Sequence, residues 1–299
     1  MRVLLTGGTG YIGSAVLDSL VRAGHHVDAL VRNREKATDV QARGAHPVVG
    51  DLGRPETYVA VAAAADGAIH TAMDDSPRGY ALDALTLDTL LTLPARPGRF
   101  FVYTSGVWVL GAAPTPVDEA APLNPIEKSA WRVPHEQRVL AAASDGLRTV
   151  VVRPGIVYGG CRGIVGDLFK SAANGLVRVI GTGENHWPLV YDRDLGELYQ
   201  MLAANATASG VFHANDECDE QVNDVVAAIA GHVSIRPSIR KVPLPEAHKK
   251  MGPFADALAL DQIVRSPRAR ALGWTPSLHA VSRTAARRFE ERRRGREAA

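Results

Sequence analysis

Three glycines near the start of the chain stand at the spacing of a phosphate-binding turn. Gly7, Gly10 and Gly13 lie in "TGGTGYIG", between a short apolar run and a segment whose apolar residues recur at helical spacing. In a strand-turn-helix unit, the first glycine permits the tight turn and the second lets the backbone approach a pyrophosphate, while the third lets the helix pack on the strand. Placed between strand and helix, the triplet predicts a dinucleotide site at the helix N-terminus.

A basic residue stands where the adenosine ribose of such a dinucleotide is expected. Arg32 directly follows the second apolar run, residues 27–31, and lies roughly 20 residues beyond the glycines. An acidic residue there suits the free 2′-hydroxyl of NAD, whereas a guanidinium matches the 2′-phosphate of NADP. Arg34 is a second candidate contact. We expect NADP, with NAD as the alternative cofactor; an exposed arginine at a strand end is the competing interpretation.

The elements that position these residues follow the rhythm of a doubly wound sheet. Apolar runs separated by segments that can be helical occur at "HPVVGDL", "GAIHTA", "GRFFVYTS" and "LRTVVVRPG". This alternation predicts an α/β fold with a parallel sheet. Asp51 follows the third run at the sheet edge where ligands bind, so it could accept from an adenine amino group or simply cap the next turn.

Composition excludes several classes of function. The 299 residues are 46% apolar and 22% charged, with a formal net charge of +2, so no long-range field favours nucleic acid or an acidic membrane surface. A local basic surplus at residues 287–297 is read as a solvated helix end. Cys161 and Cys218 match no metal or redox spacing, so we expect no metal site. Without a signal peptide or a membrane-length apolar run, a cytoplasmic protein is expected.

The motifs together resemble the extended or atypical short-chain dehydrogenase/reductase group of the NAD-dependent epimerase/dehydratase type. The matching segments run in family order: "TGGTGYIG", "GDL", "AIHTA", "VYTSGVWVLG", "RPGIVYG" and "VYDRDL". The resemblance implies a Rossmann domain over residues 1–160, completed by 188–215, and a smaller, mainly substrate-binding domain over 161–299. It implies cofactor contacts, besides Arg32, at Gly7, Gly10, Tyr11, Ile12, Gly13, Asp51, Leu52, His70, Thr71, Thr104 and Pro154. A small-molecule substrate and, by analogy, a homodimer are also implied.

The catalytic segment departs from the family pattern. Family members carry a serine and, roughly two dozen residues later, a Tyr-x-x-x-Lys whose tyrosine transfers a proton while hydride moves. Alignment on "VYTSGVWVLG" puts Trp131 at the tyrosine position and His135 at the lysine position. An indole N–H cannot shuttle a proton near neutral pH, whereas an imidazole can. His135 is therefore either a contact of the cofactor ribose or substrate, or a histidine on the helix surface.

Pro134 affects where these two side chains should point. Because proline biases the preceding residue away from helical geometry, we expect the helix to begin near residue 134. Trp131 and His135 then need not share a helix face. Trp131 is either a wall of the substrate pocket or an ordinary packing residue.

Other side chains are candidates for proton transfer or substrate contact. Ser105 has a hydroxyl at a strand end. Tyr158 follows the sixth strand and is the best single candidate for the proton donor. The alternative role of Tyr158 is to line the pocket. The predicted pocket residues are Trp131, Tyr191, Trp187 and His186. Asp194 is expected to cap a helix over 195–204.

Three functions remain open from the sequence. The first is an enzyme that binds NADP(H) and transfers hydride to or from a small organic substrate with a proton donor other than tyrosine. The second is an isomerase, epimerase or dehydratase without net redox change. The third is a regulatory protein that senses the nucleotide.

Overall fold

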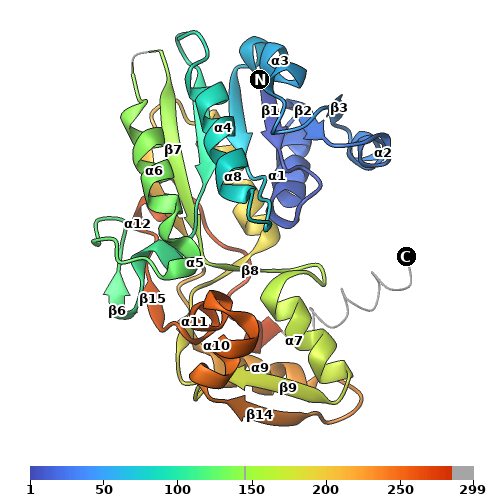
Figure 1. Ribbon diagram of the computed structural model, residues 1–299, viewed down its shortest axis with the longest axis vertical. Coiled ribbons are helices and arrows are strands. Elements are labelled where there is room, and N and C mark those ends of the chain that lie inside the picture. The colour runs from blue at the N-terminus through green and yellow to red at the C-terminus, as the bar shows by residue number, and fades with distance from the viewer. Residues whose placement is uncertain (145, 285–299) are drawn as a thin grey trace. The chain divides into compact units, whose positions relative to one another are not determined.

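The computed structural model describes residues 1–144 and 146–284, which form two compact units interleaved along the chain (Figure 1). Unit 1 comprises residues 1–105, 131–153 and 195–212, and unit 2 comprises 106–130, 154–194 and 213–284. The basic stretch at 287–297 lies outside the described residues. No helix within these described ranges has the length and apolar character that crossing a membrane requires.

Unit 1 is built on a seven-stranded sheet in the order β12-β7-β5-β4-β1-β2-β3. Its strands are β1 (Arg2–Thr6), β2 (His26–Val31), β3 (His46–Val49), β4 (Gly67–His70), β5 (Phe100–Thr104), β7 (Arg148–Pro154) and β12 (Gly210–Ala214). The pairs from β3 through β7 are parallel. Strand β1 lies between β2 and β4, which makes its carboxyl end the switch point where ligands bind in such sheets. The predicted Rossmann-type α/β fold is confirmed.

Helices cover both faces of this sheet. They are α1 (Tyr11–Arg22), α2 (Arg34–Ala42), α3 (Val59–Ala64), α4 (Gly79–Leu91), α6 (Arg132–Ala141) and α8 (Asp192–Ala204). Because side chains alternate along a strand, Leu4 faces the core shared with α3, α4 and α6. On α8, a Cβ at Gly196 would lie 2.5 Å from the backbone oxygen of Ala15 in α1, so these two helices pack closely.

Unit 2 contains four short strand pairs around its own apolar core. Three pairs, β8/β11, β9/β14 and β6/β15, are parallel, and β10/β13 is antiparallel. Its strands are β6 (Ala113–Val117), β8 (Ile156–Tyr158), β9 (Leu176–Ile180), β10 (His186–Trp187), β11 (Leu189–Tyr191), β13 (Glu220–Gln221), β14 (Ser238–Val242) and β15 (Gln262–Val264). Its helices are α5 (Glu127–Ala130), α7 (Gly163–Ala173), α9 (Val222–Gly231), α10 (Leu244–Met251), α11 (Pro253–Ala259) and α12 (Pro267–Ala271).

Asp194 does not cap the helix as the sequence suggested. Helix α8 begins at Asp192, so Asp194 lies inside its first turn. The Asp194 carboxylate instead accepts hydrogen bonds from the backbone N–H groups of Ser277 and Leu278 and from the Ser277 hydroxyl. The residue therefore anchors the segment after α12 within unit 2.

Candidate functional site

The glycine loop after β1 has the geometry that its sequence predicted. Gly7 has a φ of +75°, and a Cβ there would lie 2.6 Å from the backbone nitrogen of Ala72. A Cβ at Gly13 would lie 2.1 Å from the backbone oxygen of Gly7, so α1 can approach the loop only because residue 13 is glycine. At Gly10 the nearest such atom, also the Gly7 oxygen, is 3.0 Å away. The loop is thus tight at all three glycines, and at Gly10 the Gly7 oxygen is the one atom that a Cβ would meet within 4 Å.

The N-terminus of α1 is left uncapped by side chains. Gly10 is the N-cap, and no side chain hydrogen-bonds there. Tyr11, Ile12 and Gly13 form the first turn of the helix. The backbone N–H groups of a first helical turn point out of the N-terminus. A helix N-terminus without a side-chain cap suits a bound phosphate group.

The residues predicted for the adenosine half lie at the carboxyl ends of β2 and β3. Arg32 is exposed directly after β2, and the next residue, Asn33, caps α2 by accepting from the Lys36 backbone N–H at 2.9 Å. The Asp51 carboxylate accepts from the Gly53 N–H at 2.7 Å, which is the turn-capping role weighed from the sequence. Its contact with adenine, like the phosphate contact of Arg32, stays a prediction.

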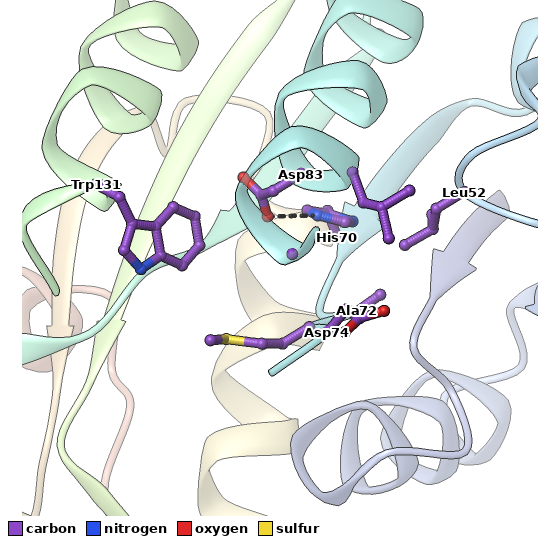
Figure 2. Close-up of a pocket in the computed structure, with 9 residues that line it drawn as sticks. Leu52, His70, Ala72, Asp74, Asp83 and Trp131 are labelled. Carbon is purple, nitrogen blue, oxygen red and sulfur yellow. Dashed lines mark hydrogen bonds and ion pairs between the residues drawn. The ribbon is translucent and has the colours of Figure 1, made fainter. Parts of the chain in front are cut away.

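A small pocket in unit 1 lies between α4, the segment after β4 and Trp131 (Figure 2). Its lining includes two residues predicted for the cofactor, Leu52 and His70. The His70 side chain is buried, and its ring is engaged on both nitrogens: Nδ1 lies 2.6 Å from Thr6 Oγ1 and Nε2 lies 3.0 Å from Asp83 Oδ1. Thr71 is also engaged, because its hydroxyl donates to the Thr6 carbonyl at 2.8 Å.

Asp83, on α4, collects hydrogen bonds from three neighbouring elements. Besides His70 Nε2, its carboxylate accepts from the Tyr103 hydroxyl at 2.9 Å and from His135 Nδ1 at 2.6 Å. Burial alone would raise the pKa of Asp83, but the hydrogen bonds from His135 and His70 outweigh it and hold that pKa well below its usual range. Burial, reinforced by the Asp83 charge, raises the pKa of the Tyr103 hydroxyl. Asp83 is therefore a buried anion that holds three proton donors.

His135 has one nitrogen committed and one available. Its Nδ1 donates to Asp83, whereas no partner for Nε2 is found among the residues that the structure describes. A carboxylate on one side of an imidazole fixes its tautomer and stabilises its protonated form, which leaves the second nitrogen able to give or take a proton. His135 thus has the local environment of a general acid or base.

Trp131 and His135 lie side by side, an arrangement that the sequence left open. Helix α6 begins at Arg132, so Pro134 occupies the third position of the first turn, where a missing N–H costs no helical hydrogen bond. The Trp131 and His135 ring centroids are 5.2 Å apart at 81°. Tyr80 stacks on Trp131 at 4.9 Å, and the Arg132 guanidinium lies 4.4 Å from the indole centroid.

Two buried polar atoms near this segment have no hydrogen-bond partner within residues 1–144 and 146–284: the Trp131 indole nitrogen and Ser105 Oγ. Buried polar groups are nearly always hydrogen-bonded, so these two atoms stand out among the described residues. Thr104, by contrast, is already engaged, since its hydroxyl lies 2.6 Å from the Tyr199 hydroxyl. Within the described residues, the Ser105 hydroxyl and the Trp131 indole N–H are thus unpaired, whereas the Thr104 hydroxyl is paired.

The predicted site residues of unit 2 lie largely in its core. Tyr158, Tyr191 and Trp187 all belong to one buried apolar cluster. The Tyr158 hydroxyl donates to the Leu278 carbonyl at 3.4 Å, and the Tyr158 and Tyr191 rings stack at 5.9 Å. Packing accounts for these positions, and their catalytic or substrate roles stay predictions, as does a cofactor contact at Pro154.

His186 and Trp187 are held by the segment after α11. The His186 ring and backbone N–H both contact Asp261 Oδ1, at 2.9 and 2.8 Å. The Trp187 indole donates to the Leu258 carbonyl at 3.1 Å.

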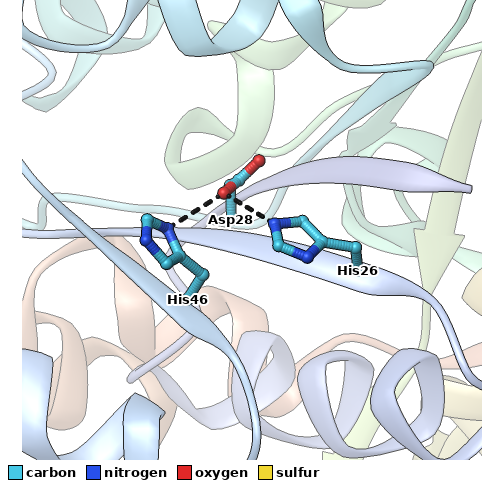
Figure 3. Close-up of side chains that lie close together, drawn as sticks. All are labelled: His26, Asp28 and His46. Atoms are coloured by element: carbon cyan, nitrogen blue, oxygen red, sulfur yellow. Dashed lines mark hydrogen bonds and ion pairs between the residues drawn. The ribbon is translucent and has the colours of Figure 1, made fainter.

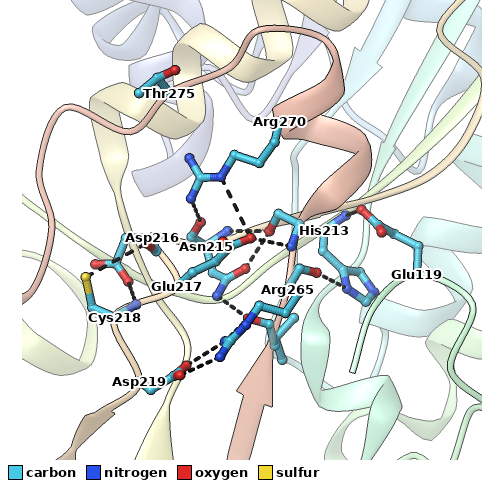
Figure 4. Close-up of polar contacts among 12 residues, drawn as sticks. Glu119, His213, Asn215, Asp216, Glu217, Cys218, Asp219, Arg265, Arg270 and Thr275 are labelled. Atoms are coloured by element: carbon cyan, nitrogen blue, oxygen red, sulfur yellow. Dashed lines mark hydrogen bonds and ion pairs between the residues drawn. The ribbon is translucent and has the colours of Figure 1, made fainter. Parts of the chain in front are cut away.

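Unit 2 has a polar cluster of its own, which surrounds the loop after β12 (Figure 4). Arg265 binds the Asp219 carboxylate through two nitrogens, at 2.8 and 2.6 Å. Burial raises the pKa of Asp216 to about 6, although the N–H groups of Cys218 and Ala280 donate to its carboxylate. The same burial raises the pKa of the Cys218 thiol to about 11, so this thiol is not a nucleophile near neutral pH.

Sequence reasoning missed Asp83, Tyr103 and a buried ion pair. Arg153 Nε lies 3.1 Å from both carboxylate oxygens of Glu136, a pair that joins β7 to α6. The signal for Asp83 is an acidic residue within the apolar helical stretch "GYALDALTLDTLL", which the sequence analysis did not weigh. Charged residues at apolar helix positions are buried only when paired, so an acidic residue in this stretch indicates buried partners.

Comparison with known proteins agrees with this geometry. Residues 3–214 match the model of the NAD dependent epimerase/dehydratase family. The chain belongs to this family. An uncharacterised protein of Schizosaccharomyces pombe is 31% identical over 93% of this chain and 95% of its own length. The 2-alkyl-3-oxoalkanoate reductase of Stenotrophomonas maltophilia is 30% identical over 77% of this chain and 76% of its own.

Solved structures of the epimerase/dehydratase family share the fold. The human epimerase family protein SDR39U1, crystallised with NADPH, superimposes with a TM-score of 0.77 at 22% identity, covering 97% of this chain and 99% of its own. The family resemblance predicted from the motifs is confirmed, and named relatives include reductases.

Proposed function

We propose that this chain is an NADP(H)-dependent reductase or dehydrogenase of small carbonyl compounds in which His135, supported by Asp83, replaces the family's tyrosine as proton donor. The observation that carries the proposal is the 2.6 Å contact between His135 Nδ1 and Asp83 with Nε2 left available. A 3-oxoalkanoate or related β-keto compound is the proposed substrate class, because the reductase relative from Stenotrophomonas maltophilia acts on one.

The residues of unit 1 fit a dinucleotide. The glycine loop has no side chain at Gly10 and leads into a helix N-terminus without a side-chain cap, which suits the pyrophosphate. Arg32, exposed after β2, supplies a guanidinium for a 2′-phosphate, which favours NADP over NAD. Ser105 Oγ and the Trp131 indole N–H offer two further polar contacts to a bound ligand.

The chemistry divides between cofactor and protein. When bound, NADPH supplies a hydride for the carbonyl carbon of the substrate. His135 Nε2–H donates its proton to the carbonyl oxygen as charge develops there, and the ring then regains a proton from solvent. Asp83 keeps Nδ1 protonated and stabilises the imidazolium before transfer, so the ring always presents Nε2. In the oxidation direction His135 accepts the alcohol proton instead.

The pH dependence of turnover tests this role. NADPH oxidation should be measured with a panel of 3-oxo acids over a range of pH, and the wild-type rate should show a pH-dependent limb that requires His135. His135→Ala should lower kcat roughly 100-fold or more and remove that limb of the profile. His248→Ala is the matched control, because His248 pairs with Asp256 at 2.8 Å on the surface.

Two outcomes would contradict the assignment. A His135→Ala variant that keeps the wild-type pH profile would leave His135 as a structural residue. Substrate conversion without net consumption of NADPH would instead favour the epimerase or dehydratase chemistry that the family also performs.

A further inference from the structure

Two histidines and an aspartate meet at the amino ends of β2 and β3 (Figure 3). His26 and Asp28 are two residues apart on β2, so they share one face of the strand. His46 begins β3, and the parallel register pairs it directly with Asp28. The sheet therefore places all three side chains together, although the sequence analysis expected no metal site.

The distances suit one small divalent cation. His26 Nε2 lies 3.2 Å and His46 Nδ1 lies 3.1 Å from the same oxygen, Asp28 Oδ1. Zinc binds histidine nitrogen and carboxylate oxygen at about 2.0–2.1 Å, which puts neighbouring ligand atoms of a tetrahedron about 3.3 Å apart. Asp28 Oδ1 thus already stands near this spacing from each histidine nitrogen, and all the ligand atoms lie within 4.8 Å of one another.

The Asp28 carboxylate is oriented by a hydrogen bond from a neighbouring side chain. The Asp28 side chain is fully buried, and its other oxygen, Oδ2, accepts from Arg2 Nε at 2.5 Å. Arg2 therefore orients the carboxylate with Oδ1 toward the histidines, as outer partners orient metal ligands. The two histidine side chains are 56% and 62% exposed, so ions can enter and water can fill the fourth position.

We propose that His26, Asp28 and His46 form a binding site for one Zn²⁺ ion. Two histidines and one carboxylate with an open position are a recurrent zinc ligand set. The site lies at the amino ends of the strands, whereas the glycine loop follows the carboxyl end of β1. The proposal is therefore independent of the proposed hydride transfer, and the ion would stabilise the β2–β3 edge of unit 1.

Calorimetric titration of ZnCl₂ into metal-free, untagged full-length protein tests the site. One ion per chain should bind, and His26→Gln and His46→Gln should each weaken binding at least tenfold. His25→Gln and His248→Gln are the matched controls: His25 precedes His26 but contacts the N-terminal amine, and His248 is an exposed histidine already paired with Asp256. Both should bind zinc as wild type does.

Thermal unfolding with and without ZnCl₂ gives a second readout. Zinc should raise the Tm of wild type and of both controls, and the rise should disappear in His26→Gln and His46→Gln. Absence of zinc binding to wild type would overturn the proposal, as would binding that survives in both His26→Gln and His46→Gln. NADPH titration of the same variants should be unchanged, which separates this test from that of the proposed function.

Discussion

Replacing Asp83 by asparagine should destabilise unit 1 far more than its small change in shape suggests. The carboxylate accepts from three donors, His70, His135 and Tyr103, at 3.0, 2.6 and 2.9 Å. Asparagine keeps one acceptor oxygen, but its NH₂ group replaces the other oxygen and faces a hydrogen-bond donor that it cannot accept from. One charge-assisted hydrogen bond is lost, at about 1.5–3 kcal/mol, and a buried donor loses its partner, at about 1–3 kcal/mol.

The expected loss in the free energy of unfolding is therefore roughly 3–5 kcal/mol, a large share of the ~5–15 kcal/mol that stabilises a typical domain. Urea denaturation at neutral pH measures it, followed by circular dichroism and by tryptophan fluorescence, because agreement of the two probes supports a two-state analysis. Tyr103→Phe is the control, since it removes only one of the three donors and should cost about 1.5–3 kcal/mol. The reasoning fails if Asp83→Asn costs no more than Tyr103→Phe.

Three further predictions concern the glycine loop, the ribose position and the loop of unit 2. Gly13→Ala should abolish NADPH binding measured by fluorescence, because its Cβ would lie 2.1 Å from a backbone oxygen; Gly231→Ala, whose Cβ meets nothing within 4 Å, should bind normally. Arg32→Asp should weaken NADP binding about 10- to 100-fold while sparing NAD, and equal losses for both cofactors would refute the phosphate contact. Because the pKa of Asp216 is raised to about 6, its contribution to stability is complete below about pH 4 and is lost as the pH rises through about 6. The stability difference between wild type and Asp216→Asn should thus fall by roughly 3 kcal/mol from about pH 4 to about pH 7, and a constant difference would contradict the shift.

Local signals predicted the nucleotide end of unit 1 well. The turn at Gly7 and the close approach at Gly13 follow from residue type and immediate neighbours, so the glycine loop could be derived from a short window. Helix α6 begins at Arg132, two residues before Pro134 and after Trp131, which agrees with the start expected near residue 134, and its first turn accommodates the proline.

Partners distant in sequence were beyond such reasoning. Asp83 and His135 are 52 positions apart, and nothing in either segment names the other. The meeting of His26, Asp28 and His46 likewise depends on the register between β2 and β3, which periodicity alone does not determine. Pairs of this kind become visible only once the sheet order is known.

The interleaving of the two units affects how the chain folds during translation. Unit 1 begins at the first residue, yet its edge strand β12 and helix α8, which packs on α1 through Gly196, are synthesised only near residue 212. While the ribosome is still translating unit 2 segments, the nascent Rossmann sheet exposes an unpaired β7 edge and an apolar face of α1. Stopping the chain after Arg153 would make that temporary exposure permanent. The nucleotide-binding half should therefore aggregate when expressed alone, and should become soluble when residues 192–214 are supplied in trans.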